Sequence, residues 1–143
     1  MGYQLCSFNA TDELNYPIYH TNVMMSVGQQ YVIVCLESIR DRQERQKLID
    51  FIHLSRKEMI PISMLQVDKF CGNCLQVSNR LGLLVLCSSQ TAYDAFTSDQ
   101  LRLLKNFSPG SLAVVDFSCI EKPSGGSVRC SLLECFPTKF IMK

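Results

Sequence analysis

Residues 23–36 read Val23-Met24-Met25-Ser26-Val27-Gly28-Gln29-Gln30-Tyr31-Val32-Ile33-Val34-Cys35-Leu36. Two apolar runs rich in strand-forming residues flank a short segment that begins with glycine, which is the pattern of a β-hairpin. A helix is predicted to open at Ser38, which can cap it, and the short strand 59–62 follows that helix. The expected buried stripe of the helix is Leu48, Ile49 and Ile52.

The same order of elements returns about fifty residues later, which indicates a structural repeat. Thr97 and Gln100 form a capping-box pattern at the start of a helix in this second unit. The expected elements are a hairpin (75–78 and 83–87), helical segments (91–96 and 97–107) and a strand (112–116). We therefore predict an α/β protein with a lead-in (1–19), two ββαβ modules (20–62 and 71–117), and a glycine loop with a last strand (123–136).

Composition argues against several kinds of partner. The 143 residues, 47% of them hydrophobic, are enough for one globular domain. The 14 Lys and Arg against 13 Asp and Glu form no dense basic patch, so we expect no nucleic acid and no anionic lipid as partner. Because no apolar run approaches the ~20 residues of a membrane helix and no secretion signal is present, we expect no membrane insertion and a cytoplasmic location.

The eight cysteines are better explained as reduced core residues than as a disulfide framework, because Cys35, Cys87 and Cys135 fall inside hydrophobic runs. The stretch Cys71-Gly72-Asn73-Cys74 supplies two ligands where structural zinc needs four. It precedes a strand rather than a helix, which disfavours a redox dithiol. We predict no metal here and keep a zinc or thiol-switch role as a weaker alternative.

The glycine loop leads into a candidate nucleophile. Residues 123–130 read Pro123-Ser124-Gly125-Gly126-Ser127-Val128-Arg129-Cys130 and pass directly into an apolar run, which predicts Cys130 at a loop-to-strand junction. A buried, inert cysteine is the alternative reading.

His20 lies just before the first hairpin. If the modules surround an axis, His20 and Cys130 can meet in one cleft, where a Cys/His pair provides a nucleophile and a general acid/base. His53 is the competing histidine, but it lies in a helix that already supplies a core stripe, so a structural role is favoured for it.

Four stretches resemble the amidinotransferase and arginine deiminase-related superfamily, most of all its citrulline-utilisation hydrolases. The stretches are 19–25, 34–39, 70–73 and 125–130. The resemblance implies a pentein fold, a five-bladed α/β propeller of ββαβ modules with the active site on its axis. This chain would supply a partial propeller of about two modules plus a closing strand.

The resemblance also implies a chemistry and the residues that perform it. The superfamily's catalytic histidine falls on His20 and its nucleophilic cysteine on Cys130, so the implied activity is hydrolysis of a C–N bond in a small ureido or guanidino compound such as citrulline or arginine. Asn22 stands where deiminases often have an acidic residue, which suits a neutral ureido group. We expect the backbone amides around Gly126 and Ser127 to bind substrate, and we expect no cofactor.

The resemblance runs from about Gly2 to Phe136, while members of the superfamily have a further N-terminal half with the carboxylates that hold the substrate. We therefore expect this chain to correspond to the C-terminal half of such an enzyme. The alternative is a catalytically inactive partial propeller that works as a homo-oligomer or with a partner chain.

Overall fold

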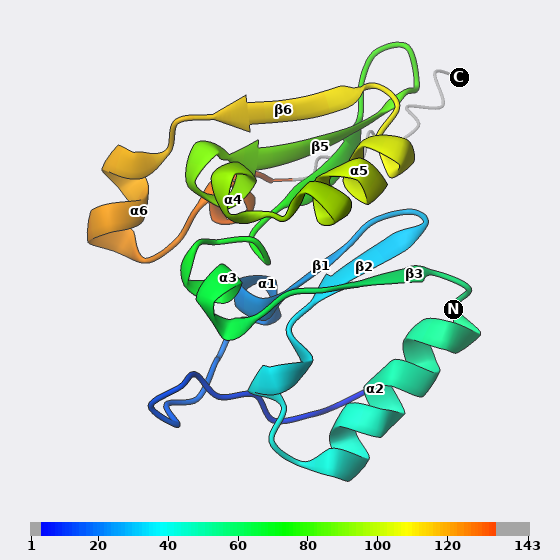
Figure 1. Ribbon diagram of the computed structural model, residues 1–143, viewed down its shortest axis with the longest axis vertical. Helices are drawn as coiled ribbons and strands as arrows, with labels where there is room; N and C mark the ends of the chain where they lie inside the picture. The colour runs from blue at the N-terminus through cyan, green and yellow to red at the C-terminus, as the bar shows by residue number, and fades with distance from the viewer. Residues whose placement is uncertain (1–3, 134–143) are drawn as a thin grey trace, which may run out of the picture.

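The structure is a computed structural model that describes residues 4–133. Two three-stranded sheets lie one above the other in Figure 1. The first sheet contains β1 (Met25–Val27), β2 (Tyr31–Val34) and β3 (Glu58–Pro61), and the second contains β4 (Leu75–Ser78), β5 (Leu84–Ser89) and β6 (Ser111–Val115). This arrangement confirms the α/β class.

Both sheets have the same connectivity. The first two strands of each sheet form an antiparallel hairpin, and the third strand pairs in parallel with the middle strand. A parallel pairing needs a crossover, which is α2 (Arg42–Leu54) in the first sheet and α4 (Gln90–Ala95) with α5 (Ser98–Phe107) in the second. The two predicted hairpins are thus confirmed.

The predicted start of α2 is wrong. Leu36–Ser38 forms the short 3-10 helix η1, and Asp41 is the residue that caps α2, where its Oδ1 accepts from the backbone N–H groups of Gln43 and Glu44. Ser38 is fully buried, and its hydroxyl donates to the Cys35 carbonyl instead. A carboxylate also suits the positive end of the helix dipole.

The remaining helix predictions are largely confirmed. In α2, Leu48 and Ile52 are buried, whereas Ile49 is only half-buried. At the start of α5, the Thr97 side chain accepts from the Gln100 N–H and the Gln100 side chain accepts from the Thr97 N–H, which is the predicted capping box.

Four further short elements were not predicted, and three of them line the candidate site. They are α1 (Thr21–Met24), α3 (Met64–Asp68), α6 (Ser118–Ser124) and the 3-10 helix η2 (Val128–Ser131). The predicted loop-to-strand junction at Cys130 is wrong, because Cys130 lies inside η2 and its N–H donates to the Ser127 carbonyl. Of the predicted last strand, Ser131 belongs to η2 and residues 132–133 are not in a strand, while residues 134–136 lie outside the described residues.

The apolar core runs through both sheets. Fully buried side chains come from β2, β3, β5 and α5, and include Ile33, Ile60, Leu86 and Leu104. The rings of Tyr31 and Phe107 stack with 5.6 Å between their centroids and tie β2 to the end of α5. In the part of the chain that the structure describes, every helix falls short of the length and apolar character that a bilayer crossing requires.

Candidate active site

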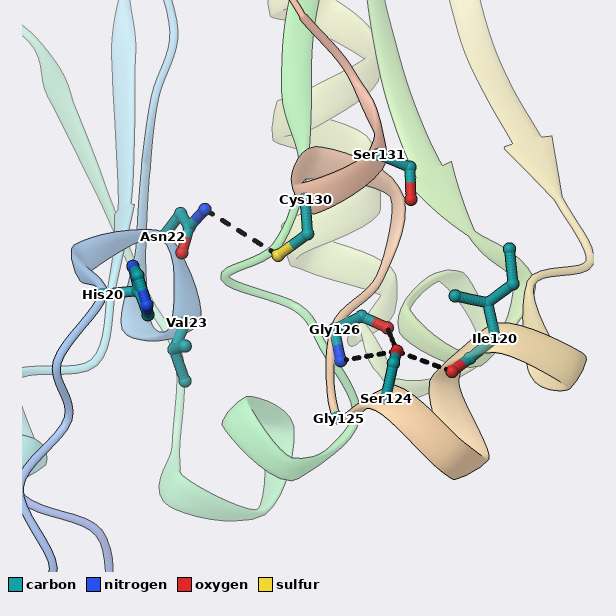
Figure 2. Close-up of a pocket in the computed structure, with 9 residues that line it drawn as sticks. All are labelled: His20, Asn22, Val23, Ile120, Ser124, Gly125, Gly126, Cys130 and Ser131. Atoms are coloured by element: carbon teal, nitrogen blue, oxygen red, sulfur yellow. Dashed lines mark hydrogen bonds between the residues drawn. The ribbon is translucent and has the colours of Figure 1, made fainter.

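A pocket of about 570 Å³ opens where the start of α1, the end of α6 and η2 meet (Figure 2). Its lining residues are His20, Asn22, Val23, Ile120, Ser124, Gly125, Gly126, Cys130 and Ser131. His20 and Cys130 therefore share one cavity although most of the chain separates them.

Cys130 is exposed, so the buried, inert alternative does not describe it. In Figure 2 its Sγ points from η2 toward Asn22, whose Nδ2 lies 3.8 Å away. Gly126 lies directly beside it, since a Cβ added to Gly126 would stand 3.3 Å from both the Cβ and the Sγ of Cys130. The sulfur is thus reachable from the pocket because residue 126 has no side chain.

His20 is the N-cap residue of α1, and its imidazole makes no capping hydrogen bond to that helix. It is exposed at the pocket wall, on the same side as Asn22 (Figure 2). His53, the competing histidine, lies on the exposed surface of α2 and is not among the residues that line the pocket.

Of the three predicted substrate-binding residues, two line the pocket and one does not. Asn22 and Gly126 line the pocket, but the Gly126 N–H already donates to the Ser124 hydroxyl at 3.2 Å, and that hydroxyl donates to the Ile120 carbonyl. Ser127 is fully buried and is not among the lining residues. Substrate contact by the amides of residues 126 and 127 therefore stays a prediction.

Ser127 instead anchors the glycine loop to α6. Its hydroxyl donates to the carboxylate of Glu121 at 2.6 Å, and the Thr91 hydroxyl donates to the same carboxylate at 2.7 Å. Burial by itself raises the pKa of Glu121, but hydrogen bonds from Ser127, Ser89 and Thr91 outweigh burial and lower it. A buried carboxylate thus fixes the segment that leads to Cys130.

Asn73 is a residue of the site that the sequence reasoning missed. Its side chain is almost fully buried, with 2% exposed, and its Nδ2 lies 2.9 Å from the Asn22 carbonyl oxygen and 3.2 Å from the Cys130 sulfur. The Cys130 N–H donates to Asn73 Oδ1, and the Arg129 N–H donates to the Asn73 carbonyl. Its membership in one of the four resembling stretches was the signal available in the sequence.

The two cysteines beside Asn73 are part of the core. Cys71 and Cys74 are buried, and burial raises the pKa of both thiols to about 12. Between them, a Cβ on Gly72 would lie 2.5 Å from the Val23 carbonyl oxygen, so glycine is needed where this stretch packs on α1. Among the described residues, no three or more His, Cys, Asp or Glu side chains are grouped to hold a metal ion.

A second cavity of about 410 Å³ adjoins the first and shares His20, Val23 and Gly125 with it. Two carboxylates, Asp12 and Asp68, belong to its lining. The cavity next to the candidate site therefore contains two acidic side chains.

Comparison with known protein families places this geometry in context. Residues 1–137 match the family model described as N,N dimethylarginine dimethylhydrolase, eukaryotic. This match confirms the resemblance to the amidinotransferase-like pentein superfamily. A comparison with curated proteins found no match.

Proposed function

Because this chain belongs to the eukaryotic N,N-dimethylarginine dimethylhydrolase family, we propose that it carries the nucleophile and the general acid/base of a hydrolase for guanidino or ureido compounds. Candidate substrates are dimethylarginine, from the family name, and citrulline or arginine, from the superfamily resemblance. The observation that carries the proposal is that His20 and Cys130 line one pocket. We propose as well that the two sheets are blades of a pentein-type propeller, which their shared connectivity supports.

The proposed reaction has two steps at one carbon. The Cys130 thiolate attacks the planar guanidino or ureido carbon, and a C–S bond forms. The C–N bond then breaks as protonated His20 gives its proton to the departing amine. In the second step, neutral His20 takes a proton from water, the water oxygen attacks the S-linked carbon, and the C–S bond breaks to return the thiolate.

The environment of the Asn22 side chain supports a role for this residue in substrate binding. Its Oδ1 is buried without a hydrogen-bond partner, while its Nδ2 faces the Cys130 sulfur. An unpaired buried acceptor costs stability unless a ligand donor reaches it. We propose that Asn22 Oδ1 accepts an N–H of the substrate, and that Asp12 and Asp68 of the second cavity lie on the side where the charged part of the substrate enters.

Substitution of the two proposed catalytic residues tests the function. We expect Cys130→Ser and His20→Ala each to lower kcat by at least about 10³-fold, in line with losses of nucleophiles and their bases elsewhere. The measurement is amine release from dimethylarginine, citrulline and arginine by the purified protein. Cys119→Ser and His53→Ala are matched controls, since both replace exposed residues that do not line the pocket. Undiminished rates in the first pair would remove both assignments.

A second candidate function is association without catalysis. Several large apolar side chains are exposed, among them Tyr19 beside the pocket at 86% and Leu133 at 87%. Such side chains favour contact with another copy or a partner chain. Light scattering together with the turnover assay separates the two functions: an active monomer contradicts association as the function, and an inactive dimer supports it.

A further inference from the structure

We propose that Asn73 is a positioning residue for the nucleophile: its side-chain amide holds the sulfur and the backbone of Cys130 at once and favours the thiolate. The inference deepens the proposed function and rests on Cys130 being the nucleophile of that site. Its basis is a set of contacts that a residue needed only for packing would not make.

Asn73 uses both ends of its side-chain amide to bind its neighbours. The Nδ2 group donates to the Cys130 sulfur at 3.2 Å and to the Asn22 carbonyl at 2.9 Å, while Oδ1 accepts the Cys130 N–H at 3.4 Å. The Asn73 side chain thus holds both the sulfur and the backbone N–H of Cys130. Rotation of the Cys130 side chain away from the pocket would break the bond to its sulfur.

The burial of Asn73 strengthens these hydrogen bonds. With 2% of the residue exposed, its amide has little water to compete for its donors, and a hydrogen bond to an ionised group is stronger in such surroundings. The Asn22 Nδ2 approaches the same sulfur at 3.8 Å as a second, weaker donor. An N–H donor stabilises a thiolate more than a thiol, since the thiolate is the better acceptor.

Several charged and titratable groups lie around Cys130 and Asn73. His20, the N-cap residue of α1, lines the same pocket as Cys130, and Arg129 precedes Cys130 in η2. Glu121 of α6 accepts a hydrogen bond from Ser127. The buried thiols of Cys71 and Cys74 flank Asn73 itself. Of these, His20 lines the same pocket as Cys130, so its effect must be separated from that of Asn73.

Thiol alkylation against pH tests the proposal without any substrate. The probe is iodoacetamide, and modification of Cys130 is followed by mass spectrometry of its peptide. Asn73→Asp keeps the acceptor for the Cys130 N–H but replaces the donor by a carboxylate. We expect its alkylation rate at pH 7 to fall at least about tenfold and the midpoint of the profile to move to higher pH.

Two further variants make this result specific. Asn73→Ser, which is smaller and uncharged, should shift the profile in the same direction by a smaller amount. Asn79→Asp is the matched control. Asn79 lies in the exposed turn after β4, and its Oδ1 accepts from the Leu81 and Leu83 N–H groups, a role that an aspartate oxygen can keep. It should keep the wild-type profile. Repeating the series with His20→Ala shows whether the shift is independent of the imidazole.

The outcomes separate this proposal from the proposed function. Folded Asn73 variants with the wild-type alkylation profile would overturn the positioning role even if Cys130→Ser is inactive. A shifted profile in a protein that turns over no guanidino or ureido compound would support the positioning role and refute the function.

A measurement on the unmodified protein covers the case in which the Asn73 variants do not fold. The side-chain NH₂ signals of Asn73 are followed by ¹⁵N NMR as the pH is changed. They should move with the midpoint found for alkylation of Cys130. Signals that stay constant through that midpoint would overturn the proposal.

Discussion

The reach of Cys130 into the pocket depends on one missing side chain. Gly125 ends α6 in the left-handed region at φ 65°. Gly126 follows it and lies against the Cys130 side chain. These two glycines have different physical tasks. Gly125 supplies a backbone conformation, with open space where a Cβ would stand, whereas Gly126 supplies room beside the sulfur.

Alanine at each glycine separates these tasks. We expect Gly126→Ala to slow both alkylation of Cys130 and turnover by roughly tenfold, because the new methyl group lies against the sulfur and narrows the approach of any electrophile. Gly125→Ala should cost about 1 kcal/mol of unfolding free energy and leave alkylation unchanged. The measurements are thermal unfolding and the iodoacetamide rate, and equal effects of the two variants on both would contradict this division.

At the scale of elements, α6 and η2 are held together by a buried carboxylate. Glu121 lies in α6, and it receives hydroxyl donors from Ser127 just before η2 and from Thr91 in α4. Because the folded-state pKa of Glu121 is lowered, its carboxylate contributes stability above the pKa of the unfolded chain. That contribution is lost as pH falls through the lower, folded-state pKa.

Glu121→Gln tests this contribution. At pH 7 the variant should lose about 1–2 kcal/mol of unfolding free energy, because hydrogen bonds to an ionised group become bonds to a neutral amide. The difference from wild type should shrink as pH falls below about 4.3, where the carboxylate of the unfolded chain protonates. Urea unfolding at several pH values measures it. A gap that widens toward acid would show that Glu121 does not act through its charge.

At the scale of the whole molecule, the site spans the contact between the two sheets. His20 and Asn22 come just before the first sheet, Asn73 comes just before the second, and Cys130 follows it. Gln76 of β4 bridges the two modules, since its Oε1 accepts the Gln29 N–H at 2.7 Å and its Nε2 donates to the Phe107 carbonyl at 2.9 Å. The relative position of the sheets therefore sets the distance between the proposed catalytic groups.

Gln76→Ala should weaken this contact. The substitution removes the hydrogen bonds that Gln76 makes to the Gln29 N–H and to the Phe107 carbonyl. We therefore expect a loss of about 1–2 kcal/mol of unfolding free energy and a Tm lower by roughly 2–8 °C. Gln90→Ala is the matched control: Gln90 is exposed and its side chain donates to Asp94 one turn along α4, so its loss should stay below about 0.5 kcal/mol. Equal Tm losses in the two variants would contradict the role of Gln76 as a bridge.

The features that the sequence predicted well are those that neighbours along the chain control. The hairpin around Gly28 and the capping box of Thr97 and Gln100 depend on contacts within a few residues, so their patterns predict them correctly. Asp41 took the place predicted for Ser38 because Ser38 is buried and bonded to the Cys35 carbonyl, which the local pattern does not contain.

The sequence by itself determined the class of the fold, through two apolar hairpins each followed by helix and strand, and the resemblance predicted His20 and Cys130 as a catalytic pair. Only the tertiary structure decided that Cys130 lies in η2, that the Gly126 N–H is bonded to Ser124, and that Asn73 reaches the sulfur. The physical reason is range. Asn73 contacts Asn22 and Cys130 only when both sheets have packed together. These residues are far apart in the sequence, so the spacing of residues does not predict such contacts.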